Sequence, residues 1–445
     1  MSDFMFEYVH LKNFKSFSDL NFNLLDRHNE PKKLVFIYGE NGVGKTNLAS
    51  CFHFLSMSLC TLSNNDFIES LLSSKIDRID KSLLSDLYKA RYSGIEHLIH
   101  EYKMAASLDN LLLEFGFRLN GKRGKYILET DDAEVVHERL EYVLSKNRGV
   151  YCDITPHKKN INTRIFKNKT AYNEIISSCS KYWGKHTFFS IVFNEIDNKT
   201  KSYMLDQFED NFASLIHYFR RLSCKITTSS SSSRVALSIP SGMISDLRQG
   251  FIEESNISQL DKTERMLNVF FKAISKDTDS LYYMRNKDEN GIEYKLIHKK
   301  RIAGKVRDID FTQESTGIKA LLDLLPYMLV TSCGSTSIID EFDMGVHDML
   351  ADKLVESMNE TLSGQLIMTT HNISIMDSGI PYDCLYVINE LEDQSKEVFP
   401  ITHYYPKLNK NSSASTQYIK GTFKAIPTAS TVNFSSLLSM LELDI

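Results

Sequence analysis

The chain has 445 residues, of which 42% are hydrophobic and 24% charged, a balance that is typical of globular proteins and excludes wholesale disorder. Its 52 basic and 57 acidic side chains give a formal net charge of −5, so any nucleic-acid site must be a local basic patch. The seven cysteines are scattered and form no CxxC pair, which argues against a disulfide framework and a structural zinc site.

The N-terminal residues 1–7 contain two acids and neither a basic segment nor an apolar segment of a signal peptide. No apolar stretch of the sequence approaches the roughly 18 residues that are needed to span a bilayer. Together with the cysteine pattern, this predicts a cytoplasmic protein that is neither secreted nor inserted in a membrane.

Apolar runs at Phe6–Leu11 and Leu34–Tyr38 predict two strands, and the second leads through a glycine-rich loop into a helix expected over Thr46–Leu59. Helical spacing continues through about residues 61–110. An Asn-Gly pair between two apolar runs predicts a β-hairpin at residues 111–131.

Further along the chain, the Thr/Ser run at residues 227–233 predicts an exposed flexible loop. Residues 281–309 are expected to form strands, and a helix-then-strand rhythm follows through residue 389. The end of the chain is polar and irregular until a short helix expected at residues 434–443.

The glycine-rich loop has the GxxxxGKT pattern of a phosphate loop. Its glycines let the backbone approach a nucleotide, its lysine can reach the β and γ phosphates, and its threonine hydroxyl can ligate magnesium. The following helix presents free N–H groups to the anion. The loop therefore predicts a site for ATP and Mg²⁺. Its candidate ATP-binding residues are Gly39, Glu40, Asn41, Gly42, Val43, Gly44, Lys45 and Thr46.

Two later strand ends complete the expected site. The apolar run before Asp340 and Glu341 predicts a buried strand, with Asp340 as a metal-site residue and Glu341 as the group that polarises the attacking water. After an intervening helix, a second apolar strand ends in Thr-Thr-His, so His371 is predicted to touch the γ-phosphate or the water.

The order of these motifs resembles ATPases of the ABC class. The signature element here is Glu314-Ser315-Thr316-Gly317. The resemblance implies that Ser315 and Gly317 bind the γ-phosphate of ATP held by a second subunit, in a homodimer or higher oligomer that forms through the ATPase heads. The segment at residues 11–17 looks like the opening of SMC, RecF and OLD-type ATPases, which implies that Asn13 and Lys15 lie near the nucleotide.

The chain also resembles stand-alone bacterial AAA-family ATPases of anti-phage systems, of the abortive-infection, PARIS-like or Septu-like kind. This resemblance rests on the chain length, on the Glu-Ser-x-Gly signature and on the segment Tyr418–Pro427, which has the pattern Tyr-x-x-Gly-x-Phe-x-x-Ile-Pro. It implies a partner encoded separately, an effector that is a nuclease or a toxin.

We therefore expect an α/β P-loop NTPase with an ABC-type head, a small antiparallel β subdomain and a mostly helical insertion. The expected core comprises residues 1–60 and 290–445. Residues 61–289 are the expected insertion, which includes the 111–131 hairpin of the β subdomain.

Three rival classes fit less well. In a transporter head, the signature lies much closer to the phosphate loop than the 269 residues that separate Thr46 from Ser315. The middle of the chain lacks the heptads of an SMC coiled coil. Only 74 residues follow His371, without the carboxylate cluster of an OLD-type nuclease. A RecF-like or SMC-like DNA-binding ATPase of repair or maintenance remains the alternative.

Two basic stretches leave nucleic-acid binding open. They run through residues 157–169 and 295–307. Each suits either a solvated charged face or contacts with phosphates.

Overall fold

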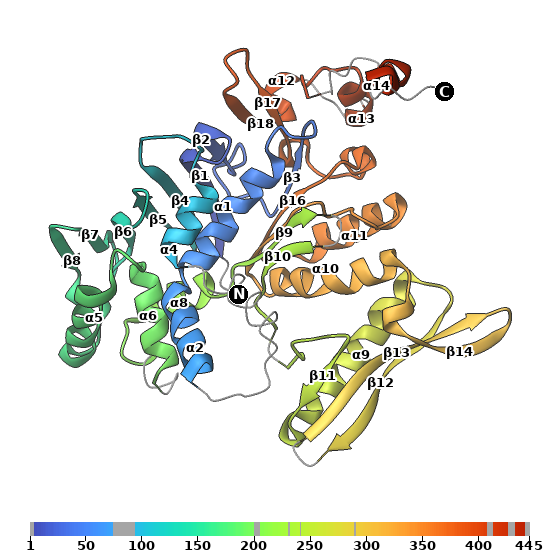
Figure 1. The fold of residues 1–445 in the computed structure, drawn as a ribbon, viewed down its shortest axis with the longest axis horizontal. Helices are drawn as coiled ribbons and strands as arrows, with labels where there is room; N and C mark the ends of the chain where they lie inside the picture. The colour runs from blue at the N-terminus through green and yellow to red at the C-terminus, as the bar shows by residue number, and fades with distance from the viewer. Residues whose placement is uncertain are drawn as a thin grey trace.

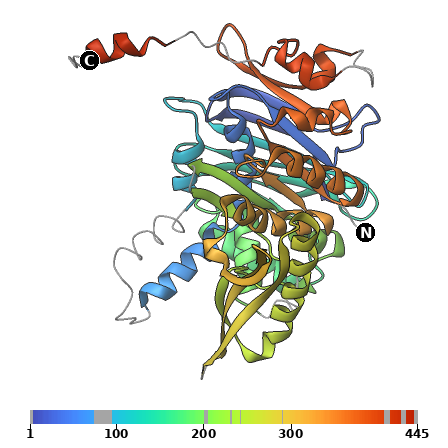
Figure 2. The same cartoon turned by 90° about the vertical axis from the view of Figure 1, so that its right-hand side faces the viewer.

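In the computed structural model, the described residues form three sheets and the helices that pack on them (Figures 1 and 2). The structure describes residues 4–73, 94–199, 205–229, 232–240, 242–288, 291–406, 413–425 and 432–440. Among these residues, no helix combines the length and the apolar character that crossing a membrane requires.

The central sheet has the strand order β10-β9-β15-β16-β3-β17-β18, and its five inner strands are parallel. Every residue of β3, β15 and β16 is buried, as expected for a parallel sheet that is covered on both faces. The strands are β3 (Leu34–Tyr38), β9 (Ser223–Ser229), β10 (Ser232–Ala236), β15 (Thr336–Ile339), β16 (Gln365–Thr369), β17 (Leu385–Glu390) and β18 (Lys396–Pro400).

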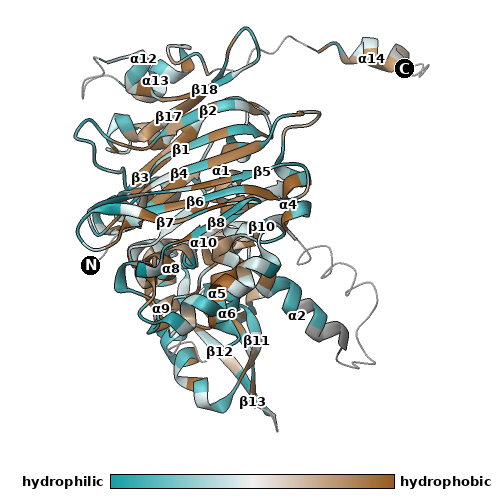
Figure 3. Cartoon of the chain, turned by 90° about the vertical axis from the view of Figure 1, so that its left-hand side faces the viewer, coloured by the Kyte–Doolittle hydropathy of each residue, from teal (hydrophilic) through white to brown (hydrophobic). Residues whose placement is uncertain are grey.

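The second sheet is antiparallel throughout, in the order β2-β1-β4-β5-β6-β7-β8. Alternating apolar and polar bands follow its strands in Figure 3, as a sheet with one face in the core requires. The expected hairpin at residues 111–131 is present, with Asn120 and Gly121 at its turn, both at positive φ. The strands are β1 (Phe4–Phe14), β2 (Phe17–Asn23), β4 (Leu111–Leu119), β5 (Lys122–Thr130), β6 (Val135–Val143), β7 (Arg148–Thr155) and β8 (Lys158–Ile161).

Helix α1 (Lys45–Ser58) lies between these two sheets (Figure 1). Its Phe52 ring contacts Phe6 and Phe115 of the antiparallel sheet, while other residues of the helix contact β9 and β16 of the central sheet. Both sides of the helix are consequently buried, which explains why its sequence is apolar nearly all round. This packing fixes the position of the phosphate loop at the N-terminus of α1.

The other face of the central sheet packs on α10 (Thr316–Ser332) and α11 (Asp348–Thr361). Helices of the middle region, among them α6 and α8, join the core that contains α1 and the antiparallel sheet. Other helices of the described residues are α2 (Thr61–Ser73), α4 (Ile95–Tyr102), α5 (Lys169–Tyr182), α6 (Phe188–Asp197), α8 (Asp210–Phe219), α12 (Ile401–Tyr404), α13 (Ala414–Ile419) and α14 (Phe434–Met440). Short 3-10 turns are η1 (Thr163–Ile165), η2 (Glu254–Asn256), η3 (Phe311–Gln313), η4 (Ile373–Asp377) and η5 (Tyr382–Cys384).

A third sheet forms an arm beside α9 (Ile257–Ile274). It consists of β11 (Gln249–Ile252), β12 (Thr278–Asp288), β13 (Gly291–Ile302) and β14 (Lys305–Asp310). The hairpin of β13 and β14 stands out from the body at the right of Figure 1.

Two expectations differ from the structure. The segment 61–289 was expected to be mostly helical apart from its 111–131 hairpin, yet strands β6–β12 also come from it, beside helices α2, α4, α5, α6, α8 and α9. The expected flexible loop at 227–233 is also wrong in part. Thr227–Ser229 end strand β9, where the Thr227 N–H donates to Asp340 at 3.3 Å, and Ser232 and Ser233 begin β10, while residues 230 and 231 lie outside the described residues. The boundaries of the domains remain a prediction.

Candidate functional site: a nucleotide-binding edge of the central sheet

The phosphate loop joins β3 to α1 at the carboxyl edge of the central sheet. Gly39, Gly42 and Gly44 all have positive φ, at 152°, 81° and 118°, which favours glycine at each position. A Cβ atom on Gly39 would lie 2.8 Å from Cγ1 of Val43, so a side chain would crowd the cradle. No acidic residue lies in the first turn of α1, so its N–H groups and the positive end of its dipole are available to an anion at the loop.

Lys45 folds back over this loop. Its Nζ atom donates to the carbonyl oxygens of Gly39 and Glu40, each at 2.9 Å. Burial lowers the pKa of Lys45, and the nearby carboxylates of Asp340 and Glu341 oppose that shift. The cation therefore lies where the phosphates of a nucleotide in the loop would need it.

Asp340 is the central side chain of the site and is fully buried. Its carboxylate accepts hydrogen bonds from the Thr46 hydroxyl at 2.9 Å, from the Thr369 hydroxyl at 2.6 Å and from the Thr227 N–H at 3.3 Å. Burial raises the pKa of Asp340, whereas these bonds lower it. One carboxylate thus joins α1 with the ends of β15, β16 and β9.

Oxygen ligands of this kind are the ones that Mg²⁺ prefers. The Thr46 hydroxyl and the Asp340 carboxylate are already within hydrogen-bonding distance of each other. This pair fits a magnesium ion bound beside the phosphate loop.

Glu341 follows directly and has an unusual backbone. Its φ is 51°, in the left-handed region that costs a non-glycine residue free energy, and such strain clusters at functional sites. Its N–H donates to the Thr369 hydroxyl at 2.8 Å, which holds this conformation. Burial raises the pKa of the Glu341 carboxyl, and the charges of Asp340 and Asp343 raise it further. A raised pKa is a property of general bases.

His371 lies just beyond the end of β16, with an exposed side chain. Partial burial lowers its pKa, the charge of Lys45 lowers it further, and Asp343 and Asp340 oppose the shift. The hydroxyl of Tyr38 donates to the carbonyl of the next residue, Asn372, at 3.2 Å. His371 is therefore within electrostatic range of the lysine and the acids of the site.

Asn13 and Lys15 flank the turn after β1, and both have left-handed φ values, 53° and 48°. The Asn13 amide donates to the carbonyl of Asn110, and the Lys15 ammonium lies 4.5 Å from the centre of the Tyr102 ring. Ser16 of this turn touches α1, since its hydroxyl accepts from the Asn47 amide at 2.9 Å. Proximity of Asn13 and Lys15 to a nucleotide stays a prediction.

The predicted signature lies at the start of α10. Ser315 caps this helix through a long bond of 3.4 Å to the Ile318 N–H. A Cβ atom on Gly317 would lie 2.8 Å from the Gly345 carbonyl oxygen. Among the described residues, no hydrogen bond joins Ser315 to the phosphate loop of the same chain. Glu314 is buried and accepts from the ring of His298 at 2.8 Å.

Four residues of the site were not singled out as site residues from the sequence: Lys225, Thr227, Asp343 and Thr369. Lys225 and Thr227 belong to β9, which pairs in parallel with β15 and so reaches the same edge of the sheet. The charge of Asp343 acts on Lys45, Glu341 and His371. For Thr227 and Thr369 the sequence offers one signal, which is that each hydroxyl residue follows a largely apolar segment.

The C-terminal segment that resembled anti-phage ATPases also reaches the loop. Tyr418 approaches the backbone of Gly39, and its hydroxyl donates to the Ala425 carbonyl at 3.0 Å. The Tyr418 ring lies 5.9 Å from the ring of Tyr38. Residues far apart in the chain therefore meet at the start of the phosphate loop.

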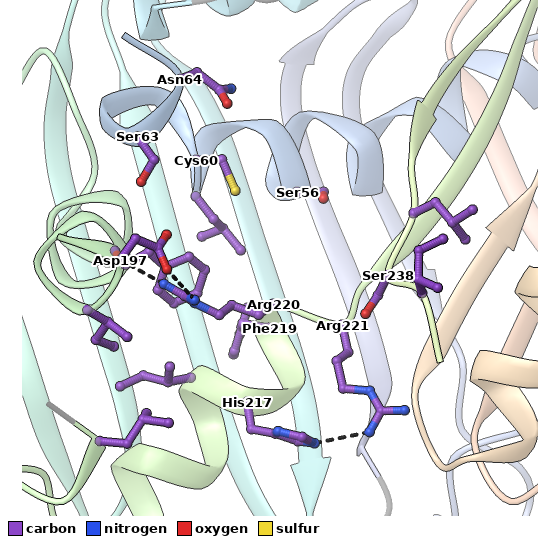
Figure 4. Close-up of a pocket in the computed structure, with 17 residues that line it drawn as sticks. Ser56, Cys60, Ser63, Asn64, Asp197, His217, Phe219, Arg220, Arg221 and Ser238 are labelled. Carbon is purple, nitrogen blue, oxygen red and sulfur yellow. Dashed lines mark hydrogen bonds and ion pairs between the residues drawn. The ribbon is translucent and has the colours of Figure 1, made fainter. Parts of the chain in front are cut away.

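A cavity of about 710 Å³ lies elsewhere, among α1, α2, α6 and α8 (Figure 4). Arg220 in its wall is paired with Asp197 at 2.9 Å, and Arg221 contacts His217 at 3.1 Å. None of the residues predicted for the nucleotide site lines this cavity, so it is separate from that site.

Comparison with known proteins decides the family. The AAA domain family matches residues 8–290, which is more than half of the chain. The chain belongs to the AAA domain family. A second family, described as "AAA domain, putative AbiEii toxin, Type IV TA system", matches residues 229–377. These matches confirm the expected AAA-type ATPase at the level of the family.

No curated protein matches the chain. Among solved structures, an SMC head bound to the C-winged helix domain of ScpA is 15% identical, with 88% of this chain and 97% of that chain covered and a TM-score of 0.43. The SMC head domain from Thermotoga maritima is 15% identical, covering 89% and 98%, with a TM-score of 0.36. An Smc head domain with a coiled coil and joint from Pyrococcus yayanosii is 13% identical, covering 96% and 100%, with a TM-score of 0.40. These are distant likenesses.

Proposed function

We propose that this AAA-family protein hydrolyses ATP with Mg²⁺ and uses the nucleotide to switch its assembly with a second copy of itself. The observation that carries the proposal is the position of Asp340, whose carboxylate bonds Thr46 of the phosphate-loop helix and Thr369 of the neighbouring strand. A magnesium ion at Thr46 and Asp340 would neutralise charge on the phosphates and orient them for attack by water.

The phosphate-loop residues bind and orient the nucleotide. Backbone N–H groups of Glu40, Asn41, Gly42 and Val43 and of the first turn of α1 surround the phosphates, and Lys45 supplies a cation to the β and γ positions. The carbonyls that Lys45 now contacts hold its ammonium at the loop before a nucleotide arrives. Little covalent chemistry is then required of the protein beyond positioning and charge stabilisation.

Glu341 acts as the group that polarises the attacking water, and His371 contacts the γ-phosphate. The raised pKa of Glu341 increases its basicity, and its fixed backbone aims the side chain from the end of β15. The lowered pKa of His371 leaves a larger share of neutral rings that can donate one hydrogen bond and accept another.

We propose that Ser315 and Gly317 complete the site of a second copy in a head-to-head dimer. The N-terminus of α10, with Ser315 at its cap, would then face the γ-phosphate in the partner's loop. ATP would stabilise the dimer, and hydrolysis would weaken it.

The assembly would control a separately encoded effector, a nuclease or a toxin, in a cytoplasmic anti-phage system. Support comes from the resemblance at Tyr418–Pro427 and from the matched family whose description names the AbiEii toxin of a type IV TA system. The alternative is a RecF-like or SMC-like ATPase that acts on DNA. Identifying a nuclease or toxin in the adjacent reading frame, and co-purifying it with this chain, would support the first proposal over the alternative.

The test of the ATPase is Glu341→Gln, measured by phosphate release and by light scattering with and without ATP. We expect turnover to disappear while ATP binding persists and the dimer accumulates. Glu360→Gln on the exposed face of α11 is the matched control, because it makes the same chemical change away from the site. Turnover of Glu341→Gln at the unmutated rate would remove Glu341 from the mechanism.

A further inference from the structure

The hairpin of β13 and β14 is a two-stranded ribbon at its tip. Ala303 and Gly304 form its two-residue turn, both with positive φ values of 48° and 74°. Strand β12 begins at Thr278, opposite Lys300, so the arm has no third strand beyond that point. Figure 1 shows the ribbon projecting away from the rest of the molecule.

The charges of this arm are distributed unequally. Several cations of the arm are paired with carboxylates: Lys300, for example, lies 3.0 Å from Asp277 and 3.3 Å from Glu314. Arg285, Lys287 and Lys295 are also paired with acids. Among the described residues no ion pair joins Lys299 to an acid, and its ammonium lies 5.1 Å from the centre of the Tyr282 ring. On β14, Lys305 beside the turn and Arg307 opposite Lys300 are exposed, and in the described part of the chain no ion pair joins either of them to an acid.

The strand register places these two free cations on one face. Lys305 is opposite Ile302 and Arg307 is opposite Lys300, so all four side chains point to the same side of the ribbon. The two cations are two residues apart along an extended strand, about 6.8 Å. Arg301, which is 67% exposed, has only a distant acid, Asp279 at 3.9 Å, and points to the other side.

A strongly charged strand edge can also serve only to prevent edge-to-edge pairing. That role does not require a ribbon that extends beyond its own sheet, or a free lysine and a free arginine on one face of that ribbon. A two-stranded β-ribbon fits the major groove of B-form DNA, where flanking cations contact phosphates. The deep and narrow major groove of A-form RNA does not admit such an element.

The base of the same hairpin is tied to the predicted signature. β14 leads through η3 into Glu314 and Ser315. Glu314 holds both His298 and Lys300 of β13, so the ribbon and the N-terminus of α10 are connected by buried polar contacts. A displacement of the ribbon would therefore be transmitted to the signature residues through these contacts.

We propose that the tip of the β13–β14 hairpin binds duplex DNA, with Lys305 and Arg307 contacting backbone phosphates. This surface lies outside the nucleotide site, and DNA binding is measured without ATP, so its failure and the failure of the proposed ATPase are distinguishable. The experiment is fluorescence anisotropy of the full chain with a labelled duplex over a series of salt concentrations.

The double variant Lys305→Gln/Arg307→Gln should weaken binding at low salt by roughly tenfold or more and reduce the slope of log K against log salt by about 2, since each lost phosphate contact contributes about 0.9. Lys287→Gln is the control on the same arm, because Glu254 already neutralises that exposed lysine. Both variants change exposed side chains, and an unchanged melting temperature verifies that they fold.

Three outcomes would overturn the proposal. The unmutated chain could fail to bind duplex DNA at low salt. The double variant could retain the unmutated slope, which would place the contacts elsewhere. Polyglutamate could compete as well as unlabelled duplex does, which would indicate a surface for an acidic protein instead of DNA.

Discussion

Thr369→Val is the most informative single substitution in the site, since valine keeps the shape of the threonine side chain and removes its hydroxyl. That hydroxyl donates to the Asp340 carboxylate at 2.6 Å and accepts from the Glu341 N–H at 2.8 Å. A hydrogen bond to a charged group contributes about 1.5–3 kcal/mol, and a buried N–H left without a partner costs about 1–3 kcal/mol.

The sum at its lower end is about 2.5 kcal/mol of lost stability, which corresponds to a fall in Tm of roughly 3 °C for a chain of this size. The left-handed backbone of Glu341 would also lose its support. We therefore expect kcat to fall by about tenfold or more, since raising the activation free energy by about 1.4 kcal/mol lowers the rate tenfold.

The assays are thermal unfolding without nucleotide and steady-state phosphate release. Thr369→Ser is the matched control, because serine keeps both hydrogen bonds and should retain most of the stability and activity. A Thr369→Val protein with the unmutated Tm and kcat would refute the reasoning that this hydroxyl organises Asp340 and Glu341.

Three other predictions concern groups in different parts of the fold. Burial raises the pKa of Asp340, and Mg²⁺ needs the ionised carboxylate, so the affinity for Mg²⁺–nucleotide should fall as the pH is lowered from neutral. Titrations with a fluorescent ATP analogue measure this affinity, and an affinity independent of pH would contradict the prediction. Burial raises the pKa of Glu138 to about 6, so the folded state holds this proton more tightly than the unfolded chain does. The resulting stabilisation is fully present below the ordinary carboxyl pKa, and about 2 kcal/mol of unfolding free energy is lost as the pH rises through 6. Denaturant unfolding should show this loss in the unmutated chain and not in Glu138→Gln. Gly317→Ala places a Cβ 2.8 Å from the Gly345 carbonyl oxygen and should lower the free energy of unfolding by about 1–3 kcal/mol, whereas unchanged unfolding would mean that the loop moves freely.

The sequence by itself determined the local parts of the site. A phosphate loop needs glycine at positive φ and a lysine and threonine at the start of a helix, and each of these requirements is met within the eight residues 39–46. The acids at Asp340 and Glu341 could also be predicted, since an apolar run before them indicates a buried strand. The α/β fold follows from the same alternation of apolar runs and helices.

Only the tertiary structure decided which strands are neighbours. Thr227 reaches Asp340 because β9 pairs in parallel with β15, which lies more than a hundred residues later in the chain. The apolar periodicity of a strand does not identify the strand that it pairs with. For the same reason, the sequence did not predict that Tyr418 lies at Gly39 or that cations along the arm are paired with acids. Local backbone chemistry thus identified the loop, while long-range packing selected the side chains that surround it.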